Sequence, residues 1–369
     1  MKCRVCNNLT NKIYETPKLP EYIWPSKKKI KISKCKVFSC KKCYSLQLQK
    51  FSKKRIKSFY GEESFNIITK KNHKDRINII KKNYYSKFFE KKNIIDIGGG
   101  VNPIFDNKNV DIMDIKISKK IKKKSKNNIY VGDIEEKKIK KKYDIIFLLH
   151  TLEHILNPLK AIKNIENLLK KNGRIFIEIP NFDYFIRKRP HYAVFHQHLN
   201  MYNIKNFKNL LSFTELSIEK VFTNNSVIFC SLKKKNKINK ILKLNLKKKF
   251  QLLKHNLKRQ KKLLINFSKK NFLYIYGAGG SSSLFIANHK FIIKKILNIY
   301  DNDNRKISKR LPGTKLLIKK TKKNKDNKSI SFYKLNRRNN FFLNELLLIV
   351  NLKNRYMIKK LKTLIKKRK

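Results

Sequence analysis

The pattern of apolar and polar positions divides the chain into four zones. From residue 93 to about 235, short runs rich in β-branched residues alternate with stretches of helical periodicity. These runs span 93–97, 109–113, 143–149, 174–179 and 216–232. Strands that alternate with helices predict a mainly parallel sheet with crossover helices, so the fold class is α/β.

The same alternation restarts near residue 272. The apolar runs there span 272–276, 296–300, 329–333 and 345–350, and a basic terminal helix is expected after them. A second, C-terminal α/β unit of Rossmann-like type is therefore predicted in series with the first.

Two zones lack this alternation. Residues 236–268 combine lysines with leucines at near-helical spacing and contain neither glycine nor proline. They predict an amphipathic connecting helix that packs on the protein, with a membrane-surface helix as the weaker alternative. Residues 1–55 hold five of the six cysteines and little periodicity. We therefore divide the 369 residues into domains 1–55, 56–235, 236–268 and 269–369.

Lysine dominates the charge of the chain, which carries 92 Lys and Arg against 24 Asp and Glu, a net charge of +68. Such a field attracts polyanions. However, the lysines are spread over every zone. Arginine, whose guanidinium can form paired hydrogen bonds with guanine or phosphate, is scarce. Lysine, isoleucine and asparagine all have A/T-rich codons. We therefore attribute the charge to genome composition and expect no specific nucleic-acid partner.

No apolar run approaches the roughly 20 residues that a transmembrane helix needs. The first residues also lack an apolar signal core. We therefore expect a cytoplasmic protein whose cysteines are thiols or metal ligands instead of disulfides.

Four cysteines form two Cys-x-x-Cys pairs, Cys3 with Cys6 and Cys40 with Cys43. Each pair can place two thiolates on one metal, and two pairs complete a tetrahedral sulfur site. Neither pair lies in a βαβ context, so a thioredoxin-like redox pair is the weaker alternative. We predict one structural zinc ion bound by these four cysteines.

A glycine loop follows the first apolar run of the central zone, with Asp96 just before Gly98 and Gly100. Glycines there let the backbone approach a ligand at the carboxyl end of the strand. A nicotinamide dinucleotide site is the alternative, but its fingerprint requires a third glycine where Pro103 stands. Asp96 instead favours a cationic, amine-bearing ligand.

Acidic residues also stand at the ends of the next two runs. Asp111 and Asp114 end the second, where a carboxylate can accept from both ribose hydroxyls. Asp133 follows the third, where it can accept from an adenine amino group. Each aspartate could instead be a turn or cap residue. The ordered series favours a ligand that contains adenosine.

This series resembles the class I S-adenosylmethionine-dependent methyltransferases. Residues 143–158 are similar to that superfamily's fourth strand and following loop, and residues 171–180 to its fifth strand. The resemblance implies S-adenosylmethionine as cofactor, bound by Asp96, Gly98, Gly100, Asp111 (or Asp114) and Asp133, with His150 beside the methyl group. One departure is that residues 101–108 are too short for the usual first helix and loop.

The whole arrangement, with its N-terminal cysteine pairs, resembles the sugar C-methyltransferase family. Residues 195–202 fall where that family carries Tyr-His-Glu-His-Leu, and residues 224–227 fall on its Gly-Gly-Ser-Leu turn. Residues 276–279 and 311–314 match its glycine loop and its Pro-Gly-Thr. The resemblance implies a nucleotide-activated sugar as substrate, bound by Tyr276, Gly277, Gly279 and Asp301.

By the same resemblance His198 is the catalytic base, with His196 and Gln197 beside it. A carbon next to a ketone becomes nucleophilic only after a base removes its proton, and the enolate can then attack the sulfonium methyl. Phe195 and Gln197 replace the family's Tyr and Glu, which would orient a histidine or stabilise an enolate.

Several alternatives stay open. O- or N-methylation of a small metabolite needs the same cofactor, and His198 could also be a structural histidine. A nucleic-acid-binding zinc protein is motivated by the charge, but the sequence carries no RNA-recognition aromatic motif and no helix-turn-helix pattern. A non-catalytic binding protein with this fold is the remaining alternative.

Overall fold

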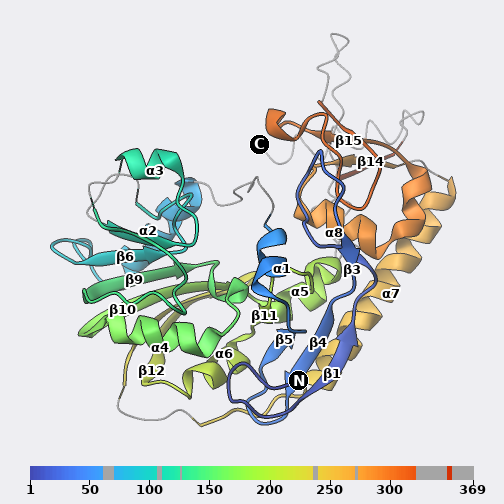
Figure 1. Cartoon of the computed structure of the whole chain (residues 1–369). Helices are drawn as coiled ribbons and strands as arrows, with labels where there is room; N and C mark the ends of the chain where they lie inside the picture. The colour runs from blue at the N-terminus through green and yellow to red at the C-terminus, as the bar shows by residue number, and fades with distance from the viewer. Residues whose placement is uncertain are drawn as a thin grey trace.

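A computed structural model describes residues 1–60, 70–105, 110–124, 127–235, 240–270, 273–320 and 347–350. Figure 1 shows a large sheet with its helices on one side of the molecule and a smaller α/β unit on the other. The N-terminal segment lies between them, and the long helix α7 runs along the outer side.

The large sheet has the strand order β12-β13-β10-β9-β6-β7-β8. Its strands are β6 (Ile94–Ile97), β7 (Val110–Asp114), β8 (Ile129–Val131), β9 (Tyr143–Leu149), β10 (Leu169–Pro180), β12 (Leu216–Asn224) and β13 (Val227–Lys234). Neighbouring strands are parallel except at β13, which is antiparallel to both of its neighbours. The predicted, mainly parallel α/β fold is confirmed. The run 216–232 is not one strand, because a turn at residues 225–226 folds it into a hairpin.

Both faces of this sheet are buried, which explains why its strands read as continuous apolar runs. Ile146 and Leu148 of β9 pack in one core with α4 (Pro158–Leu168). Ile145 and Phe147 face the other way, into a core that contains Ile80 of α2 (Lys70–Asn83). Successive side chains of a strand point to opposite faces, so one run fills both cores.

The helices of the central unit are otherwise short. They are α3 (Lys119–Lys124), α5 (Phe182–Lys188), α6 (Ile204–Leu211) and the 3-10 turns η1 (Leu152–His154) and η2 (Pro190–Tyr192). The described residues between β6 and β7 contain no helix, as the shortness of this stretch predicts.

The N-terminal segment does not form its sheet alone. Its strands β1 (Thr10–Glu15), β4 (Lys36–Cys40) and β5 (Leu46–Leu48) are joined by β11 (Asn200–Met201) from the central unit. Strands β2 (Leu19–Pro20) and β3 (Ile32–Ser33) form a second small pair, and helix α1 (Lys53–Ser58) follows. The guanidinium of Arg4 donates to the carbonyl of Leu199 at 2.8 Å. The predicted boundary at residue 55 therefore marks a change of structure but not an independent sheet.

Helix α7 (Leu246–Lys270) begins about ten residues later than the zone predicted for it. Its buried positions Leu246, Phe250, Leu253 and Leu264 recur at helical spacing and pack on the protein. The predicted packing face is confirmed.

The C-terminal unit contains a four-stranded sheet of order β16-β15-β14-β17. Its elements are β14 (Leu273–Tyr276), α8 (Gly280–Asn288), η3 (Lys290–Lys295), β15 (Ile296–Asp301), η4 (Asn304–Lys306), β16 (Ile318–Lys320) and β17 (Leu347–Val350). Strands β14, β15 and β16 are parallel, and β17 is antiparallel to β14. The predicted strand at 329–333 and the terminal helix lie outside the described residues. Among the described helices, none has the length and apolar character of a membrane span.

Helix α7 offers a matched test of this packing. Leu253 is 1% exposed, whereas its neighbour Leu252 is 38% exposed. We expect Leu253→Ala to lower the free energy of unfolding by about 2–5 kcal/mol, because it leaves a cavity in the core. Leu252→Ala should change it by less than about 0.5 kcal/mol. Urea unfolding followed by circular dichroism measures both, and equal effects would contradict the packing of α7.

Candidate active site

The candidate site lies where the order of the parallel strands reverses, between β6 and β9. Ligands of open α/β sheets bind at the carboxyl ends of the strands at such a point. The loop after β6 carries Gly98, whose φ is +94°, and a Cβ at this position would collide with the hydroxyl of Thr151. The loops that follow β6 and β9 are therefore packed against each other, and only glycine fits at residue 98.

Asp96 supports this loop from inside. It is buried, and one of its carboxylate oxygens accepts a hydrogen bond from the backbone N–H of Ile104 at 2.8 Å. Burial raises the pKa of Asp96 to about 7. The carboxylate also lies next to Gly99, so Asp96 supports the loop, and its contact with the cofactor stays a prediction.

Asp114 replaces Asp111 as the candidate for binding ribose. Asp111 is buried within β7, and its carboxylate accepts from the Tyr143 hydroxyl at 2.7 Å and from Lys141 Nζ at 2.9 Å. Asp114 ends β7, accepts from the backbone N–H of Gly100 at 2.9 Å and lies beside the glycine loop. The carboxylate of Asp111 is bound by partners away from the loop, so Asp114 is the better placed of the two candidates, and the contact with ribose stays a prediction.

Asp133 follows β8 at the same edge of the sheet. One of its oxygens accepts from the backbone N–H of Glu135 at 2.9 Å, so it also caps a turn. Its contact with adenine stays a prediction.

A group of ionisable side chains surrounds Glu153 at the carboxyl end of β9. Glu153 is only 1% exposed, and its Oε1 lies 3.3 Å from His150 Nδ1 and 3.7 Å from His154 Nε2. The ring of His198 lies 5.2 Å from that of His154. Three histidines from two separate segments, residues 150–154 and residue 198, thus lie around one buried carboxylate.

His150 is held by a second carboxylate. Its Nε2 lies 2.7 Å from Glu178 Oε1, and Arg76 binds the same carboxylate with two nitrogens, at 2.7 and 2.5 Å. Burial opposes the charge on His150, but hydrogen bonds with Glu153 and Glu178 outweigh it and raise its pKa to about 9. Burial also opposes the charge on Glu178, yet Arg76 and His150 lower its pKa to about 2.

Arg76, Glu153 and Glu178 are new members of the site. Arg76 lies before the glycine loop in the chain, and no motif contains it. Glu153 and Glu178 stand within the segments that resemble the fourth and fifth strands of methyltransferases. The only sequence signal for the two glutamates is an acidic residue at the end of an otherwise apolar run.

His198 is half-buried and its ring lies 4.1 Å from that of Phe195. Burial lowers the pKa of His198 to about 3, and the nearby His154 adds to this shift. The imidazole is therefore neutral near pH 7. It can accept a proton, although its basicity is weak.

His196 and Gln197 do not join this group. His196 is fully buried, and its Nε2 lies 2.8 Å from the hydroxyl of Ser33. The amide of Gln197 donates to the backbone carbonyl of Phe59 at 2.5 Å. Both side chains anchor their segment to the N-terminal part of the chain, so the structure does not bring these two predicted residues to the group around Glu153.

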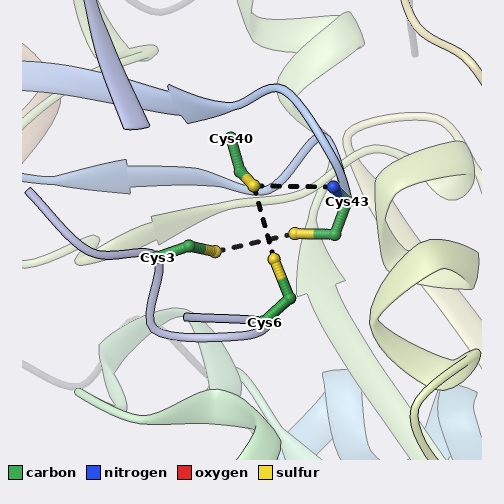
Figure 2. A group of neighbouring side chains, drawn as sticks. All are labelled: Cys3, Cys6, Cys40 and Cys43. Atoms are coloured by element: carbon green, nitrogen blue, oxygen red, sulfur yellow. Dashed lines mark hydrogen bonds between the residues drawn. The ribbon is translucent and has the colours of Figure 1, made fainter. Parts of the chain in front are cut away.

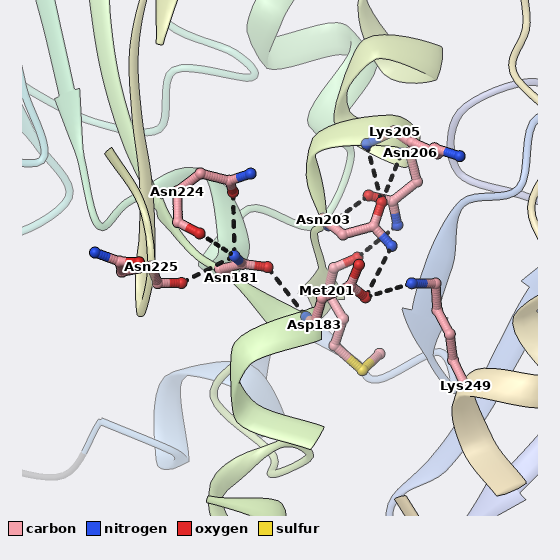
Figure 3. A network of polar contacts seen from close by, with 9 residues as sticks. All are labelled: Asn181, Asp183, Met201, Asn203, Lys205, Asn206, Asn224, Asn225 and Lys249. Atoms are coloured by element: carbon pink, nitrogen blue, oxygen red, sulfur yellow. Dashed lines mark hydrogen bonds and ion pairs between the residues drawn. The ribbon is translucent and has the colours of Figure 1, made fainter. Parts of the chain in front are cut away.

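The turn at residues 224–226 is tied to the end of β10 (Figure 3). Asn181 donates to the backbone carbonyls of Asn224 and Asn225 at 3.0 and 2.9 Å. Its own carbonyl caps α5 by accepting from the N–H of Asp183 at 3.1 Å. Asn181 therefore braces the β12–β13 hairpin.

The four paired cysteines converge from two loops (Figure 2). One sulfur–sulfur distance is 3.6 Å, between Cys3 and Cys43, and another is 3.4 Å, between Cys6 and Cys40. A tetrahedral ion with bonds of about 2.3 Å separates its sulfur ligands by roughly 3.8 Å, so the cluster fits zinc. The Cys43 thiol stabilises the thiolate of Cys3 and lowers its pKa to about 4.

The C-terminal glycine loop connects β14 to α8. Gly277 has a φ of +90°, and Gly279 stands at the N-terminus of α8 with no side chain to cap it. The Asp301 carboxylate accepts from the N–H of Ala278 at 2.7 Å and from Lys306 Nζ at 2.9 Å. Asp301 therefore shapes the loop, and its contact with a substrate stays a prediction. The side chain of Tyr276 lies outside what the structure describes.

Comparisons with known proteins identify the central unit. Residues 73–221 match the model of a family described as a methyltransferase domain. Malonyl-(acyl-carrier protein) O-methyltransferase 2 of Ilyobacter polytropus is 31% identical over 110 residues, which cover 26% of this chain and 42% of that protein. The chain thus spans less than half the length of this relative.

Solved structures of methyltransferases are also similar. An S-adenosylmethionine-dependent methyltransferase of Clostridium acetobutylicum shares 15% identity at a TM-score of 0.37 and covers 44% of this chain and 92% of its own. The plantazolicin methyltransferase BpumL, in complex with SAH, shares 17% identity at a TM-score of 0.37 and covers 50% and 90%. The family match and the sheet order together show a class I methyltransferase domain with a Rossmann-like core.

The two aspartates of β7 separate cofactor binding from stability. Asp114→Ala should weaken the binding of S-adenosylmethionine by about tenfold or more, because hydrogen bonds to a charged group contribute about 1.5–3 kcal/mol each. Asp111→Asn should lower the thermal stability and leave the affinity of the folded protein unchanged. Calorimetry with the cofactor measures both, and a loss of affinity confined to Asp111→Asn would contradict this placement.

Proposed function

We propose that the chain transfers the methyl group of S-adenosylmethionine to a small-molecule acceptor, namely a nucleotide-activated sugar or a related glycan precursor. The observation that carries this proposal is the histidine–carboxylate group at the carboxyl end of β9. His150 and Glu153 of this group lie on either side of Thr151 in the chain, and Thr151 packs against Gly98 of the glycine loop. A neutral histidine in this group can accept a proton from an acceptor that faces the cofactor.

The residues divide the work of binding the cofactor. The backbone of Gly98 to Gly100 approaches the methionine part, Asp114 accepts from the ribose hydroxyls and Asp133 from the adenine. The cofactor supplies an electrophilic methyl group on a sulfonium ion.

His198 is the proposed base. A C–H bond next to the acceptor's ketone breaks, the proton moves to an imidazole nitrogen of His198, and the electron pair forms an enolate. The enolate carbon attacks the methyl group, and the bond from this methyl to sulfur breaks to leave S-adenosylhomocysteine. Holding both partners in line supplies a further part of the rate.

The C-terminal loop is the proposed site of the nucleotide part. Gly277 leaves its backbone open, since a Cβ there would meet no atom within 4 Å, whereas a Cβ at Gly279 would lie 3.8 Å from the Trp24 ring. The N-terminus of α8 directs uncapped N–H groups to this loop, where the diphosphate of a nucleotide sugar can accept from them. Tyr276 stands at the end of the preceding strand.

O-methylation is the second candidate. The relative from Ilyobacter polytropus is named an O-methyltransferase. Phe195, in place of a tyrosine, offers no hydroxyl to stabilise an enolate. In this reaction His198 takes the proton of a hydroxyl and no C–H bond breaks.

Two independent measurements test His198 as the base. His198→Ala should lower turnover about a hundredfold or more and leave cofactor affinity nearly unchanged. Carbon acid chemistry should also exchange the acceptor's α-hydrogen with heavy water, as NMR of a keto-sugar nucleotide detects. His255→Ala, on the exposed face of α7, is the matched control. Loss of turnover in His198→Ala without hydrogen exchange would favour O-methylation. Full activity in His198→Ala would contradict His198 as the base in both C- and O-methylation.

The four cysteines are the proposed structural zinc site. Three of them are buried, and Asn209 of α6 donates to the backbone carbonyl of Cys43 at 3.2 Å, so the ion stabilises the contact between the two parts of the chain. The proposed role is structural because four sulfur ligands leave no open coordination position.

Metal analysis tests this role. We expect about one cysteine-bound zinc ion per chain, and Cys40→Ser should lose it together with the stability of the N-terminal segment. Cys230→Ala, which alters a buried thiol elsewhere, should keep the zinc. A stably folded wild-type protein without zinc would contradict the proposal.

A further inference from the structure

Glu153, His154 and His198 bring three metal-binding groups to one place. One ligand atom from each lies within 4.8 Å of the other two. In the part of the chain that the structure describes, this group and the four-cysteine cluster are the two sets with such spacing. Two histidines and one carboxylate bind divalent transition metals and leave coordination positions open.

The carboxylate of Glu153 has one oxygen without a partner. Oε1 faces His150 Nδ1, whereas Oε2 is buried and makes no hydrogen bond with the described residues. An unsatisfied, buried carboxylate oxygen is costly. A cation bound at this oxygen would remove that cost.

His154 is oriented as a metal ligand would be. Its Nδ1 lies 2.7 Å from the backbone carbonyl of Gln197, which can only accept, so this nitrogen carries the proton. The lone pair therefore resides on Nε2, the nitrogen that faces Glu153. A histidine whose other nitrogen donates to a backbone carbonyl is the common arrangement around bound metals.

His198 completes the group. Its ring contacts are with Phe195, His154 and Tyr192, and its side chain makes no hydrogen bond with the described residues. The ring can therefore turn to close the site to bonds of about 2.0–2.1 Å.

We propose that Glu153, His154 and His198 bind a divalent transition metal ion such as Zn²⁺ or Co²⁺, separately from the four cysteines. Imidazole ligands favour these ions over Mg²⁺ and Ca²⁺, which prefer oxygen ligands. The functional consequence rests on the proposed function. When the lone pair of His198 binds the ion it cannot take a proton, so the metal inhibits methyl transfer.

The test titrates Co²⁺ into the full chain whose cysteine site is already filled with zinc. We expect one further equivalent by calorimetry, with an absorption spectrum typical of nitrogen and oxygen ligands and free of sulfur-to-metal bands. Glu153→Gln and His198→Asn should each lose this equivalent and keep the cysteine-bound zinc, and His255→Ala should keep both. No second equivalent, or one that persists in Glu153→Gln and His198→Asn, would overturn the site.

Activity forms a separate arm of this experiment. Saturating Co²⁺ should lower turnover at least tenfold, and a chelator that leaves the cysteine-bound zinc in place should restore it. Unchanged or increased turnover would overturn the inhibitory role. Metal binding in a protein that transfers no methyl group even with the chelator would instead refute the proposed function and leave the metal site standing.

Discussion

The candidate site depends on the hydrogen bonds that the buried carboxylate of Glu178 accepts. It stands near the end of β10 and is bound by Arg76 from α2 and by His150 from the end of β9. A buried charge is tolerated only when partners satisfy it, and three nitrogens do so here. His150 adopts a φ of +50°, a conformation that is costly for a residue with a side chain. The hydrogen bonds to Glu178 and Glu153 offset this cost and hold the imidazole at the carboxyl end of β9.

The N-terminal segment positions the other half of the site. Residues 195–201 contribute His198 and β11, and this stretch is held from both ends. His196 and Gln197 anchor it to Ser33 and Phe59, and β11 pairs with β5. His198 therefore reaches Glu153 only when the N-terminal sheet is formed. A zinc ion bound by the four cysteines, as proposed above, would stabilise this sheet and so act on the candidate site without touching it.

The sequence predicts the strands well because both faces of the large sheet are buried and each strand becomes a continuous apolar run. The glycine loop and the cysteine pairs can also be found from the sequence, because the residues that form each of them are close together in the chain. Asp111 and Asp114 could not be ranked, because the partners that decide between them, Tyr143 and Gly100, come from other elements.

The same limit applies to His196 and Gln197. His196 and Gln197 lie in a turn that the N–H of His198 closes by donating to the carbonyl of Phe195 at 3.2 Å, and their side chains leave this turn toward different partners. Their partners lie more than 130 residues earlier in the chain, where no local pattern identifies them. The turn at residues 224–226, by contrast, was expected from the motif at residues 224–227, and two consecutive asparagines favour a turn.

The surroundings of His150 and His198 shift the pKa values of the two imidazoles in opposite directions. His150 lies between two carboxylates that raise its pKa to about 9, whereas burial lowers that of His198 to about 3. Opposed pKa values in one pocket indicate a division of roles. Both nitrogens of His150 are occupied, at Glu153 and at Glu178, so this charged ring holds the carboxylates and cannot itself accept a proton. His198 is the proposed base, and Nε2 of His154, whose Nδ1 donates to the carbonyl of Gln197, is the other nitrogen of the group that can accept a proton. Burial lowers the basicity of His198, so removal of a proton from the acceptor needs groups that stabilise the anion left behind.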